Sequence, residues 1–254
     1  MKKRVDVLLV ERGLAESRTQ AQALLMAGRV HGYDKAGTQV DVDAELVVEA
    51  PARFVSRGGE KLAHALEAFG VEIGGRSCLD VGASTGGFTD ALLQAGAARV
   101  IALDVGYGQL HSRLRADPRV TVLERVNARY LEALPFPVEL VTCDVSFIGL
   151  RTVLPPVLRL AAPGWEALVL VKPQFEAGRE EVGRGGVVRD AVVHGRVLLQ
   201  VAEAALGWDA ETVGAVDSGL PGPKGNREFF LQLVHREGAV LSDELRVWID
   251  RATA

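Results

Sequence analysis

The sequence predicts an α/β protein in which a Rossmann-like domain with a mostly parallel, seven-stranded sheet follows a small α+β domain. Short apolar runs alternate with helical segments throughout residues 61–206, a pattern typical of parallel strands joined by crossover helices. One of these runs passes through a glycine-rich turn straight into a helix, as in nucleotide-cofactor folds. The first thirty residues are more basic than the thirty that follow them. Because parallel strands end at the same edge of a sheet, the polar residues that follow these strands should lie close together at its carboxyl edge.

The length of 254 residues fits one large α/β domain and one small module, and 48% hydrophobic residues suffice for a sizeable core. We expect a first domain over residues 1–50, a linker over 51–58 and the sheet domain over 59–254. The net charge of −4 argues against a uniformly basic nucleic-acid-binding surface. Residues 1–30, however, carry six Lys and Arg against three acidic residues, so positive charge is concentrated locally in the first domain.

The most informative segment is Ser77–Leu92, which reads S-C-L-D-V-G-A-S-T-G-G-F-T-D-A-L. Its glycines allow the backbone to approach a ligand closely, and the free N–H groups at the helix start can face a polar ligand group. The spacing differs from the G-x-G-x-x-G turn that binds a dinucleotide pyrophosphate. The acid Asp80 would repel a pyrophosphate but suits a ligand with an amine and a sulfonium cation, which favours S-adenosylmethionine (SAM) as the cofactor. The candidate cofactor-binding residues of this segment are Asp80, Gly82, Ser84, Gly86, Gly87 and Phe88.

Further strand ends supply the rest of the predicted site. Arg99–Asp104 is a short apolar run that ends in an acid, so Asp104 is the predicted ligand of the cofactor ribose. Asn127 lies where an amide side chain can meet an adenine ring. Asp144 and Lys172 each end a later buried run and should point into one cleft, with Asp144 also near the cofactor. An NAD-dependent oxidoreductase stays open as an alternative, because Asp104 would serve a dinucleotide equally well.

Five motifs carry a resemblance to a known family: S-R-G-G-E-K-L at 56–62, D-V-G-A-S-T-G-G-F-T-D at 80–90, C-D-V-S-F-I at 143–148, V-K-P-Q-F-E at 171–176 and G-N-R-E-F-F at 225–230. Over nearly the whole chain, the sequence resembles the TlyA family, whose members also bear the name haemolysin A. The resemblance implies an FtsJ-like (RrmJ-like) methyltransferase domain behind an amino-terminal S4 RNA-binding domain, with SAM as the cofactor. It also implies methyl transfer to the ribose 2′-hydroxyl of cytidine, with ribosomal RNA or a ribosomal subunit as the partner. The implied Lys-Asp-Lys-Glu catalytic set falls on Lys61, Asp144, Lys172 and Glu228.

The chemistry of this reaction gives each member of the set a role. Methyl transfer to a ribose hydroxyl requires in-line alignment and removal of a proton from a poor nucleophile. A free lysine has a pKa of about 10.4 and becomes a useful base only after a drop of roughly 2–3 units, which a second cation and partial burial favour. We therefore expect Lys172 to be the base and Asp144 to orient it near the sulfonium. Lys61 would be the second cation and the ribose anchor, held by Glu228. A non-catalytic ribosome-assembly factor that retains the fold is the alternative, and the intact set argues against it.

The first domain resembles an S4 RNA-binding domain made of two short helices and a hairpin. The first helix should end at Gly13, and a capping box at Ser17–Gln20 opens a second helix over 21–27 that Gly28 closes. Residues 30–49 are strand-like and predict the hairpin. The predicted RNA contacts are Lys3, Arg4, Arg12, Arg18, Arg29 and, from the linker, Arg57.

The remaining features give expectations of other kinds. The glycine-rich, arginine-containing loop Gly178–Asp190 either closes over the substrate or is a plain surface loop. Cys78 and Cys143 lie in predicted buried strands, as reduced core cysteines of a cytoplasmic protein do. The five histidines lack ligand spacing, so we expect no metal. Apolar runs fall far short of the ~20 residues of a membrane span, so we expect no membrane partner.

Overall fold

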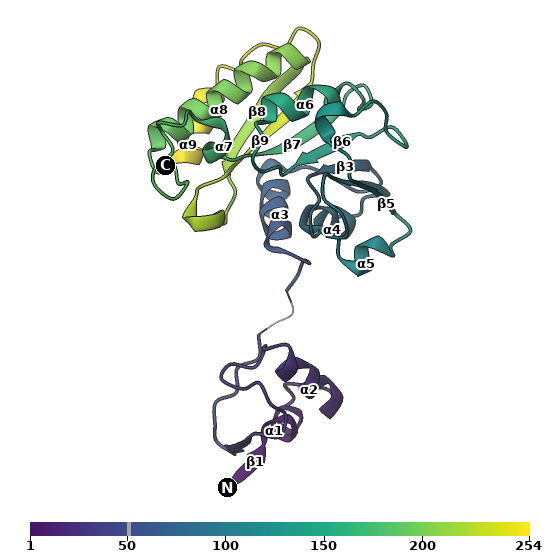
Figure 1. Ribbon diagram of the computed structural model, residues 1–254, viewed down its shortest axis with the longest axis vertical. Helices are drawn as coiled ribbons and strands as arrows, with labels where there is room; N and C mark the ends of the chain where they lie inside the picture. Colours follow the sequence, from purple (N-terminus) through teal and green to yellow (C-terminus); the bar gives the residue numbers. More distant parts are fainter. Residues whose placement is uncertain (50–51) are drawn as a thin grey trace. The chain divides into compact units, whose positions relative to one another are not determined.

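The computed structural model describes residues 1–49 and 52–254, and the chain divides into two compact units, Met1–Ala52 and Arg53–Ala254 (Figure 1). Residue 50, which ends the predicted first domain, and residue 51, which starts the predicted linker, lie outside the described residues. Arg57, expected in the linker, is instead the first residue of a helix in the second unit.

The first unit consists of β1 (Lys2–Arg4), α1 (Val5–Glu11), α2 (Arg18–Met26) and β2 (Gln39–Asp41). Helix α2 begins directly after Ser17, whose hydroxyl accepts a hydrogen bond from the Gln20 N–H at 3.2 Å. Only half of the expected capping box forms, because the Gln20 side chain accepts from the Glu16 N–H and not from Ser17. A small core holds the unit together and contains Val5, Leu8, Leu9, Ala15, Ala21, Leu25, Val30, Val40 and Leu46.

The hairpin predicted over residues 30–49 forms only as isolated bridges, one of which pairs Val30 with Val48 in antiparallel orientation. Strand β2 of this segment pairs antiparallel with β1, and elsewhere the described part of the segment forms only isolated bridges. Arg12 and Arg29 donate hydrogen bonds to backbone carbonyls of the segment, namely those of Val42, Ala44 and Glu49. Side chains thus satisfy carbonyls that a second hairpin strand would have bonded. The prediction overlooked β1, which at three residues is too short to show a periodic pattern.

The second unit contains one seven-stranded sheet with the strand order β5-β4-β3-β6-β7-β9-β8, which confirms the predicted fold class. The strands are β3 (Ser77–Val81), β4 (Arg99–Asp104), β5 (Val120–Glu124), β6 (Leu140–Cys143), β7 (Glu166–Val171), β8 (Ala210–Asp217) and β9 (Phe229–His235). Strands β3 to β7 pair in parallel, and β9 runs antiparallel to both of its neighbours. The chain reverses its direction across the sheet between β3 and β6, and such a switch point is where α/β sheets bind ligands.

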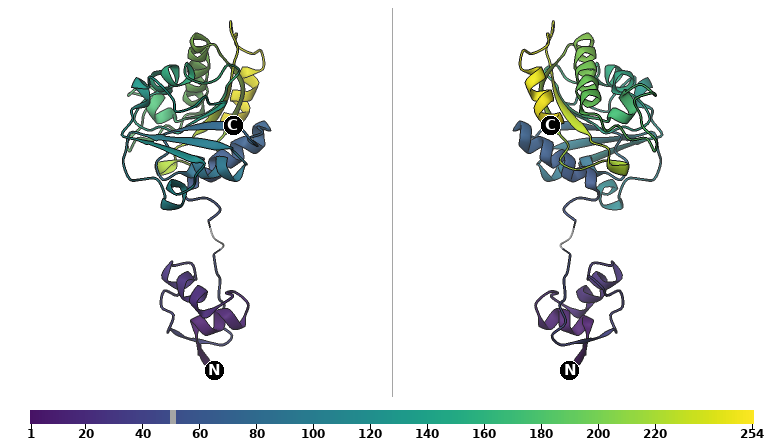
Figure 2. Two further views of the ribbon diagram at one scale, coloured as in Figure 1. Left: turned by 90° about the vertical axis from the view of Figure 1, so that its right-hand side faces the viewer. Right: turned by 90° about the vertical axis from the view of Figure 1, so that its left-hand side faces the viewer.

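Helices cover both faces of this sheet (Figures 1 and 2). They are α3 (Arg57–Phe69), α4 (Gly87–Gln94), α5 (Ser112–Arg115), α6 (Leu150–Leu158), α7 (Pro173–Glu176), α8 (Ala191–Ala205) and α9 (Leu245–Thr253). Short 3₁₀ turns occur at η1 (Ala128–Tyr130), η2 (Leu206–Trp208) and η3 (Pro223–Gly225). Apolar side chains of α6, α8 and α9 pack on one face, and those of α3, α4 and α5 pack on the other.

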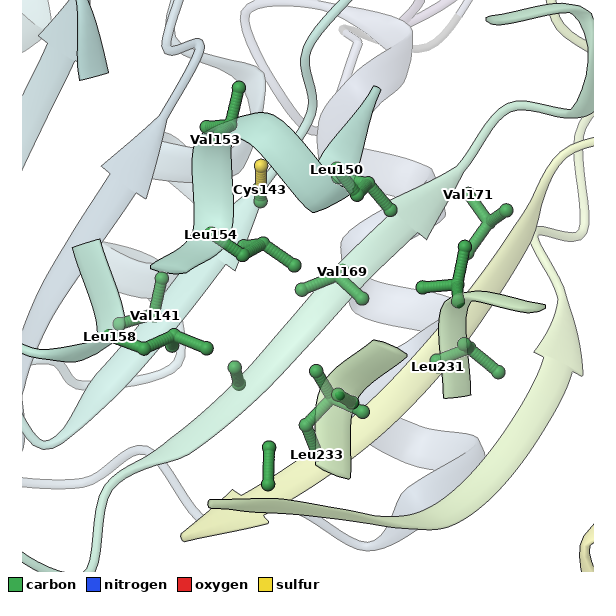
Figure 3. Close-up of a cluster of buried hydrophobic side chains, with 14 of the residues drawn as sticks. Val141, Cys143, Leu150, Val153, Leu154, Leu158, Val169, Val171, Leu231 and Leu233 are labelled. Carbon is green, nitrogen blue, oxygen red and sulfur yellow. The ribbon is translucent and has the colours of Figure 1, made fainter. Parts of the chain in front are cut away.

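Strand β7 shows how the sequence produces this three-layer arrangement. Val169 and Val171 belong to the cluster under α6, α8 and α9, whereas Leu168 and Leu170 belong to the cluster under α3 and α4. Successive side chains of a strand point to opposite faces, so a continuous apolar run is buried on both sides. Figure 3 shows the first cluster, where Val169 lies near Leu154 of α6.

Candidate active site

Two cavities open at the carboxyl edge of the sheet, beside the turn that follows β3. The first has a volume of about 410 Å³, and its lining includes Asp104 and Asn127. The second has a volume of about 380 Å³, and its lining includes Lys61, Lys172 and Glu228. We call them the Asp104 cavity and the two-lysine cavity. Both volumes are typical of small-molecule sites.

The two cavities share three lining residues, Gly82, Ser84 and Asp144. Gly82 has a φ of +85°, and a Cβ on it would overlap the backbone carbonyl of Asp144. The glycine therefore lets the β3 turn lie directly against the end of β6. A group bound in one cavity meets a group bound in the other beside Asp144.

Gly86 has a different role from the one expected. Its φ is +97°, and a Cβ on it would overlap the side chains of Leu110 and Leu114. Gly86 lines neither cavity, and its close packing against Leu110 and Leu114 is sufficient to require a glycine here. Gly87 and Phe88, the next two residues, do line the two-lysine cavity.

Asp80 also lies away from both cavities. Its carboxylate is fully buried and accepts hydrogen bonds from the N–H and the hydroxyl of Thr89, at 2.9 and 2.7 Å, and from the Thr142 hydroxyl at 3.3 Å. Burial raises the pKa of Asp80 to about 7, and the nearby charge of Asp144 acts in the same direction. The structure thus places Asp80 beneath the turn, where it anchors the first turn of α4, and not at a ligand's amine as expected.

The Asp104 cavity presents polar groups held in place by backbone hydrogen bonds. Asp104 accepts from the Ser84 N–H at 2.8 Å and from the Gly106 N–H at 2.6 Å. The Asn127 carbonyl oxygen accepts from the Arg129 N–H at 3.0 Å, which fixes its amide. An ionised carboxylate has about four lone-pair sites, so Asp104 retains acceptors for ligand hydroxyls.

Lys172 forms an ion pair with Asp144 at the mouth of the two-lysine cavity. Its Nζ lies 2.5 Å from Asp144 Oδ1 and donates to Ser146 Oγ at 3.0 Å. Lys172 directly follows β7 and Asp144 directly follows β6, so the parallel pairing of these strands brings the two residues together. The Lys172 side chain is 11% exposed and that of Asp144 is 25% exposed.

Lys61 and Glu228 form a second, more deeply buried pair. Lys61 Nζ lies 2.5 Å from Glu228 Oε2, and the two side chains are 8% and 0% exposed. Lys61 belongs to α3 and Glu228 directly precedes β9, so a contact between residues 167 positions apart closes one wall of the cavity. The four residues of the expected set all line this cavity: Lys61, Asp144, Lys172 and Glu228.

In the first unit, two of the predicted RNA contacts share one carboxylate. Arg4 and Arg18 both bond Asp6, which is fully buried, while the two guanidinium groups remain accessible.

The other predicted RNA contacts have intramolecular partners that limit them. Lys3 pairs with Glu11 at 2.7 Å, and Arg12 and Arg29 bond backbone carbonyls. Arg57 belongs to the second unit, donates to the Pro221 carbonyl at 2.8 Å and lines the two-lysine cavity. The predicted RNA contacts of the first unit therefore differ in how many of their donors the protein itself occupies: Arg12 uses both terminal nitrogens on backbone carbonyls, whereas Arg18 uses one nitrogen on Asp6.

The glycine-rich loop 178–190 is hydrogen-bonded to the loop before β9. The Asn226 side chain donates to the Gly186 carbonyl at 2.9 Å and accepts from the Val188 N–H at 3.1 Å. Lys224 donates to the Gly185 carbonyl at 2.9 Å. The two alternatives for this loop, a closing element and a plain surface loop, both remain predictions.

Sequence reasoning missed two residues of the loop after β6. Ser146 bonds Lys172, and Phe147 is 90% exposed with a φ of +66° and a ring centroid 5.0 Å from that of Phe175. Both residues belong to the C-D-V-S-F-I motif. Nothing in their residue types distinguished them, because their contacts with Lys172 and Phe175 depend on the path of the loop after β6.

Within residues 1–49 and 52–254, no group of three or more His, Cys, Asp or Glu side chains is placed to hold a metal ion. No helix of the described chain is both long enough and apolar enough to cross a membrane. Cys78 and Cys143 are buried and unpaired with each other, as expected of core cysteines.

Known proteins resemble both units of this chain. Residues 54–234 match the FtsJ-like methyltransferase family, and residues 3–31 match the S4 domain. A protein from Mycobacterium tuberculosis, named 16S/23S rRNA (cytidine-2'-O)-methyltransferase TlyA, is 51% identical over 249 residues, which cover 94% of this chain and 92% of that protein. A solved structure from Streptococcus thermophilus that carries a hemolysin name has a TM-score of 0.77 at 40% identity, covering 99% of this chain and 95% of the other.

More distant structures share the fold of the second unit. An S-adenosylmethionine dependent methyltransferase from Mesorhizobium loti has a TM-score of 0.51 at 15% identity, covering 67% of this chain and 96% of the other. This likeness confirms the fold alone, and the family match and the relative from Mycobacterium tuberculosis confirm the methyltransferase prediction, with SAM as the cofactor, over the NAD-dependent alternative. The chain belongs to the TlyA family of FtsJ-like methyltransferases with an amino-terminal S4 domain.

Proposed function

We propose that this protein transfers a methyl group from SAM to the ribose 2′-hydroxyl of a cytidine in ribosomal RNA, with Lys172 as the general base. The observation that carries the proposal is the Asp144–Lys172 ion pair, which lies where the Asp104 cavity meets the two-lysine cavity. The name of the relative from Mycobacterium tuberculosis supports the substrate class. The S4 domain supports a partner made of RNA.

The Asp104 cavity fits the nucleoside part of the cofactor. The Asp104 carboxylate would accept hydrogen bonds from ribose hydroxyls, and the Asn127 side chain would meet the adenine ring. The bound cofactor supplies an electrophilic methyl group on a sulfonium. Asp144, which lines both cavities, would place its negative charge near that sulfonium.

The two-lysine cavity would admit the target ribose. Attack by the 2′-oxygen on the methyl carbon forms the new C–O bond while the C–S bond breaks, so the chain has to align the three atoms and take up one proton. Neutral Lys172 would accept that proton at Nζ, with Asp144 and Ser146 fixing the direction of its side chain. The methyl-transfer step requires no oxidant or reductant.

Lys61 and Glu228 would help to bind the ribose, and neither would take up the hydroxyl proton. The Glu228 carboxylate holds Lys61 Nζ at 2.5 Å and keeps the ammonium facing the cavity that also contains Lys172. A fixed ammonium of this kind can donate a hydrogen bond to the ribose. The first unit would hold RNA through the accessible guanidinium groups of Arg4 and Arg18.

The test of this proposal is a map of 2′-O-methylated cytidines in ribosomal RNA. Ribosomal RNA from a strain lacking the gene is compared with RNA from the parent strain and with RNA from a strain that expresses the Lys172→Ala variant. We expect at least one cytidine methyl group to be absent in the deletion strain, restored by the intact gene and not restored by the variant. Identical maps in all strains would contradict the proposal and favour a ribosome-assembly factor that binds without turnover.

A further inference from the structure

Asp6 is a buried carboxylate in the first unit that contacts two accessible arginines. Asp6 Oδ1 accepts from Arg4 Nε at 3.0 Å, and Asp6 Oδ2 accepts from Arg4 Nη2 at 3.0 Å and Arg18 Nη2 at 3.1 Å. Gln22 donates a further bond to Oδ2 at 3.2 Å. The Asp6 side chain has no exposed surface, whereas the side chains of Arg4 and Arg18 are 43% and 56% exposed.

The shared carboxylate brings together two cations from different elements. Arg4 ends β1 and Arg18 opens α2, yet an Nη2 atom of each bonds the same oxygen, so the two guanidinium groups lie side by side. A guanidinium has five N–H donors. Asp6 accepts two from Arg4 and one from Arg18, which leaves most donors of both groups for an external anion.

The carboxylate is also ionised at neutral pH. The hydrogen bond from Arg4 holds the pKa of Asp6 well below its usual range, and those from Gln22 and Arg18 act in the same direction. Two guanidinium groups and one carboxylate leave one net positive charge at this position, and the exposed side of the cluster is the cationic one.

We propose that Asp6 is a positioning residue for RNA binding, which holds Arg4 and Arg18 as one preorganised fork for backbone phosphate. The inference rests on the proposed role of the first unit in holding RNA. Arginine binds phosphate through two parallel N–H bonds, which requires a defined orientation of the guanidinium plane. Ordering long side chains during binding costs free energy, so a carboxylate that orders them beforehand raises the affinity.

The sign of one mutational effect separates this proposal from simple charge attraction. Asp6→Asn keeps the shape of the side chain and raises the net charge of the unit by one. A surface that acts through its charge alone would then bind RNA more tightly. Loss of the preorganised fork predicts weaker RNA binding. We expect a decrease in affinity of about tenfold, because the cost of ordering one or two long side chains during binding corresponds to a factor of this size.

The experiment measures dissociation constants of the full-length protein for unmodified ribosomal RNA, purified from a strain that lacks the gene, over a series of salt concentrations. The variants are Asp6→Asn, the double variant Arg4→Ala with Arg18→Ala, and the triple combination. Asp34→Asn is the matched control, because it removes an exposed acid of the same unit. Circular dichroism and SAM titration verify that each variant is folded.

We expect Asp6→Asn to weaken RNA binding about tenfold, Asp34→Asn to leave it unchanged or slightly tighter, and the triple variant to bind like the double variant. Equal or tighter binding by Asp6→Asn would overturn the inference. So would a further loss in the triple variant, because Asp6 would then act without the arginines. Wild-type affinity of the double variant would instead reject the proposed RNA-binding role of this surface.

A second pair of substitutions covers the case in which Asp6→Asn does not fold. Arg4→Lys with Arg18→Lys conserves every charge but replaces each planar fork by a single ammonium. We expect a loss of about tenfold in RNA affinity with little change in the salt dependence. Affinity equal to that of the wild type would show that charge without orientation suffices, and would overturn the inference.

Discussion

The carboxylates of Asp6 in the first unit and Glu228 in the second are both inaccessible to solvent, but their cationic partners differ in exposure. The arginines on Asp6 reach the solvent, whereas Lys61 on Glu228 is almost entirely covered. In the first unit the buried carboxylate therefore holds cations that face the solvent. In the second unit the buried carboxylate holds a cation that faces a cavity. The outward arrangement suits a large polyanion, and the confined one suits a single group that enters the cavity.

The comparison also separates the energetic consequences of the two pairs. Arg4 and Arg18 keep part of their hydration and share one carboxylate, so loss of either arginine leaves the buried Asp6 with the other arginine and Gln22 as donors. A buried pair behaves differently, because removal of one partner leaves a charge without compensation in a poorly hydrated place. We expect substitutions near Glu228 to affect stability and catalysis, and substitutions of the arginines near Asp6 to lower RNA affinity and, because Asp6 is buried, to cost some stability as well.

The largest effect is expected at Lys172, whose pair with Asp144 is intermediate in exposure between these two. Lys172→Ala should lower the rate of methyl transfer by at least ~10²–10⁴-fold, because the hydroxyl proton loses its acceptor. SAM affinity, measured by calorimetry, should change little. Lys172→Arg should be equally inactive, since a guanidinium does not release its proton.

Lys35→Ala is a suitable control for this measurement, because it removes an exposed lysine of the first unit. Its turnover on ribosomal RNA should be within a few-fold of that of the intact protein. A Lys172→Ala protein that retained turnover within tenfold of wild type would show that the base is another group.

The second largest effect concerns the stability of the buried pair. Glu228→Gln leaves Lys61 without a counter-charge and should lower the free energy of unfolding of the second unit by ~3 kcal/mol, the low end for buried pairs, because Lys61 lines an open cavity. The double substitution Lys61→Met with Glu228→Leu removes both charges and should recover much of this loss without restoring activity. Urea unfolding measures both values. An equal loss in the single and double variants would mean that shape, and not charge compensation, maintains this wall.

The sequence predicted the sheet of the second unit well, because its strands are continuous apolar runs between polar ends. β3 and β4 have the expected starting residues, and the turn after β3 leads directly into a helix, as expected. Asp144 and Lys172 could be placed together for the same reason, since adjacent parallel strands end at one edge. Fold class and half of the catalytic set thus follow from local pattern and elementary sheet geometry.

The rest depended on contacts that a sequence does not display. Lys61 and Glu228 are separated by 167 positions, and only the family resemblance connected them. Asp80 and Gly86 have the residue types of a cofactor site, but Asp80 bonds Thr89 beneath the turn and Gly86 makes room for Leu114. A buried carboxylate and a ligand-binding one look identical in a sequence, because their difference lies in the hydrogen bonds that surround them.

A third prediction concerns pH, because Asp80 is a buried carboxyl with no cationic partner among its hydrogen bonds. Its pKa of about 7 in the folded protein exceeds the unfolded value of about 3.9, so the folded state binds more protons between these pH values. The free energy of unfolding should therefore fall as the pH rises from the unfolded to the folded pKa of Asp80, by about 2 kcal/mol between pH 5 and pH 8. Above the folded pKa, the contribution of Asp80 should no longer change with pH.

Asp80→Asn cannot ionise and should lack this component. Urea unfolding of both proteins at several pH values measures the difference between them. The free-energy curves of wild type and Asp80→Asn should converge at low pH and separate toward pH 8, where the variant is relatively more stable. Parallel curves over the whole range would show that Asp80 does not titrate as its burial predicts.

The smallest effect expected separates two exposed arginines of the first unit. Arg18 uses one guanidinium nitrogen on Asp6, so Arg18→Ala should remove a phosphate contact and lower the slope of log affinity against log salt by about 0.7–0.9. Arg12 uses both terminal nitrogens on the carbonyls of Val42 and Ala44, so Arg12→Ala should leave that slope unchanged and lower the melting temperature of the first unit. Binding of ribosomal RNA over a salt series, together with thermal melts, tests both variants. If Arg12→Ala reduced the slope as much as Arg18→Ala, the division of this surface into structural and phosphate-binding arginines would be wrong, and the whole basic face would act as a diffuse electrostatic surface.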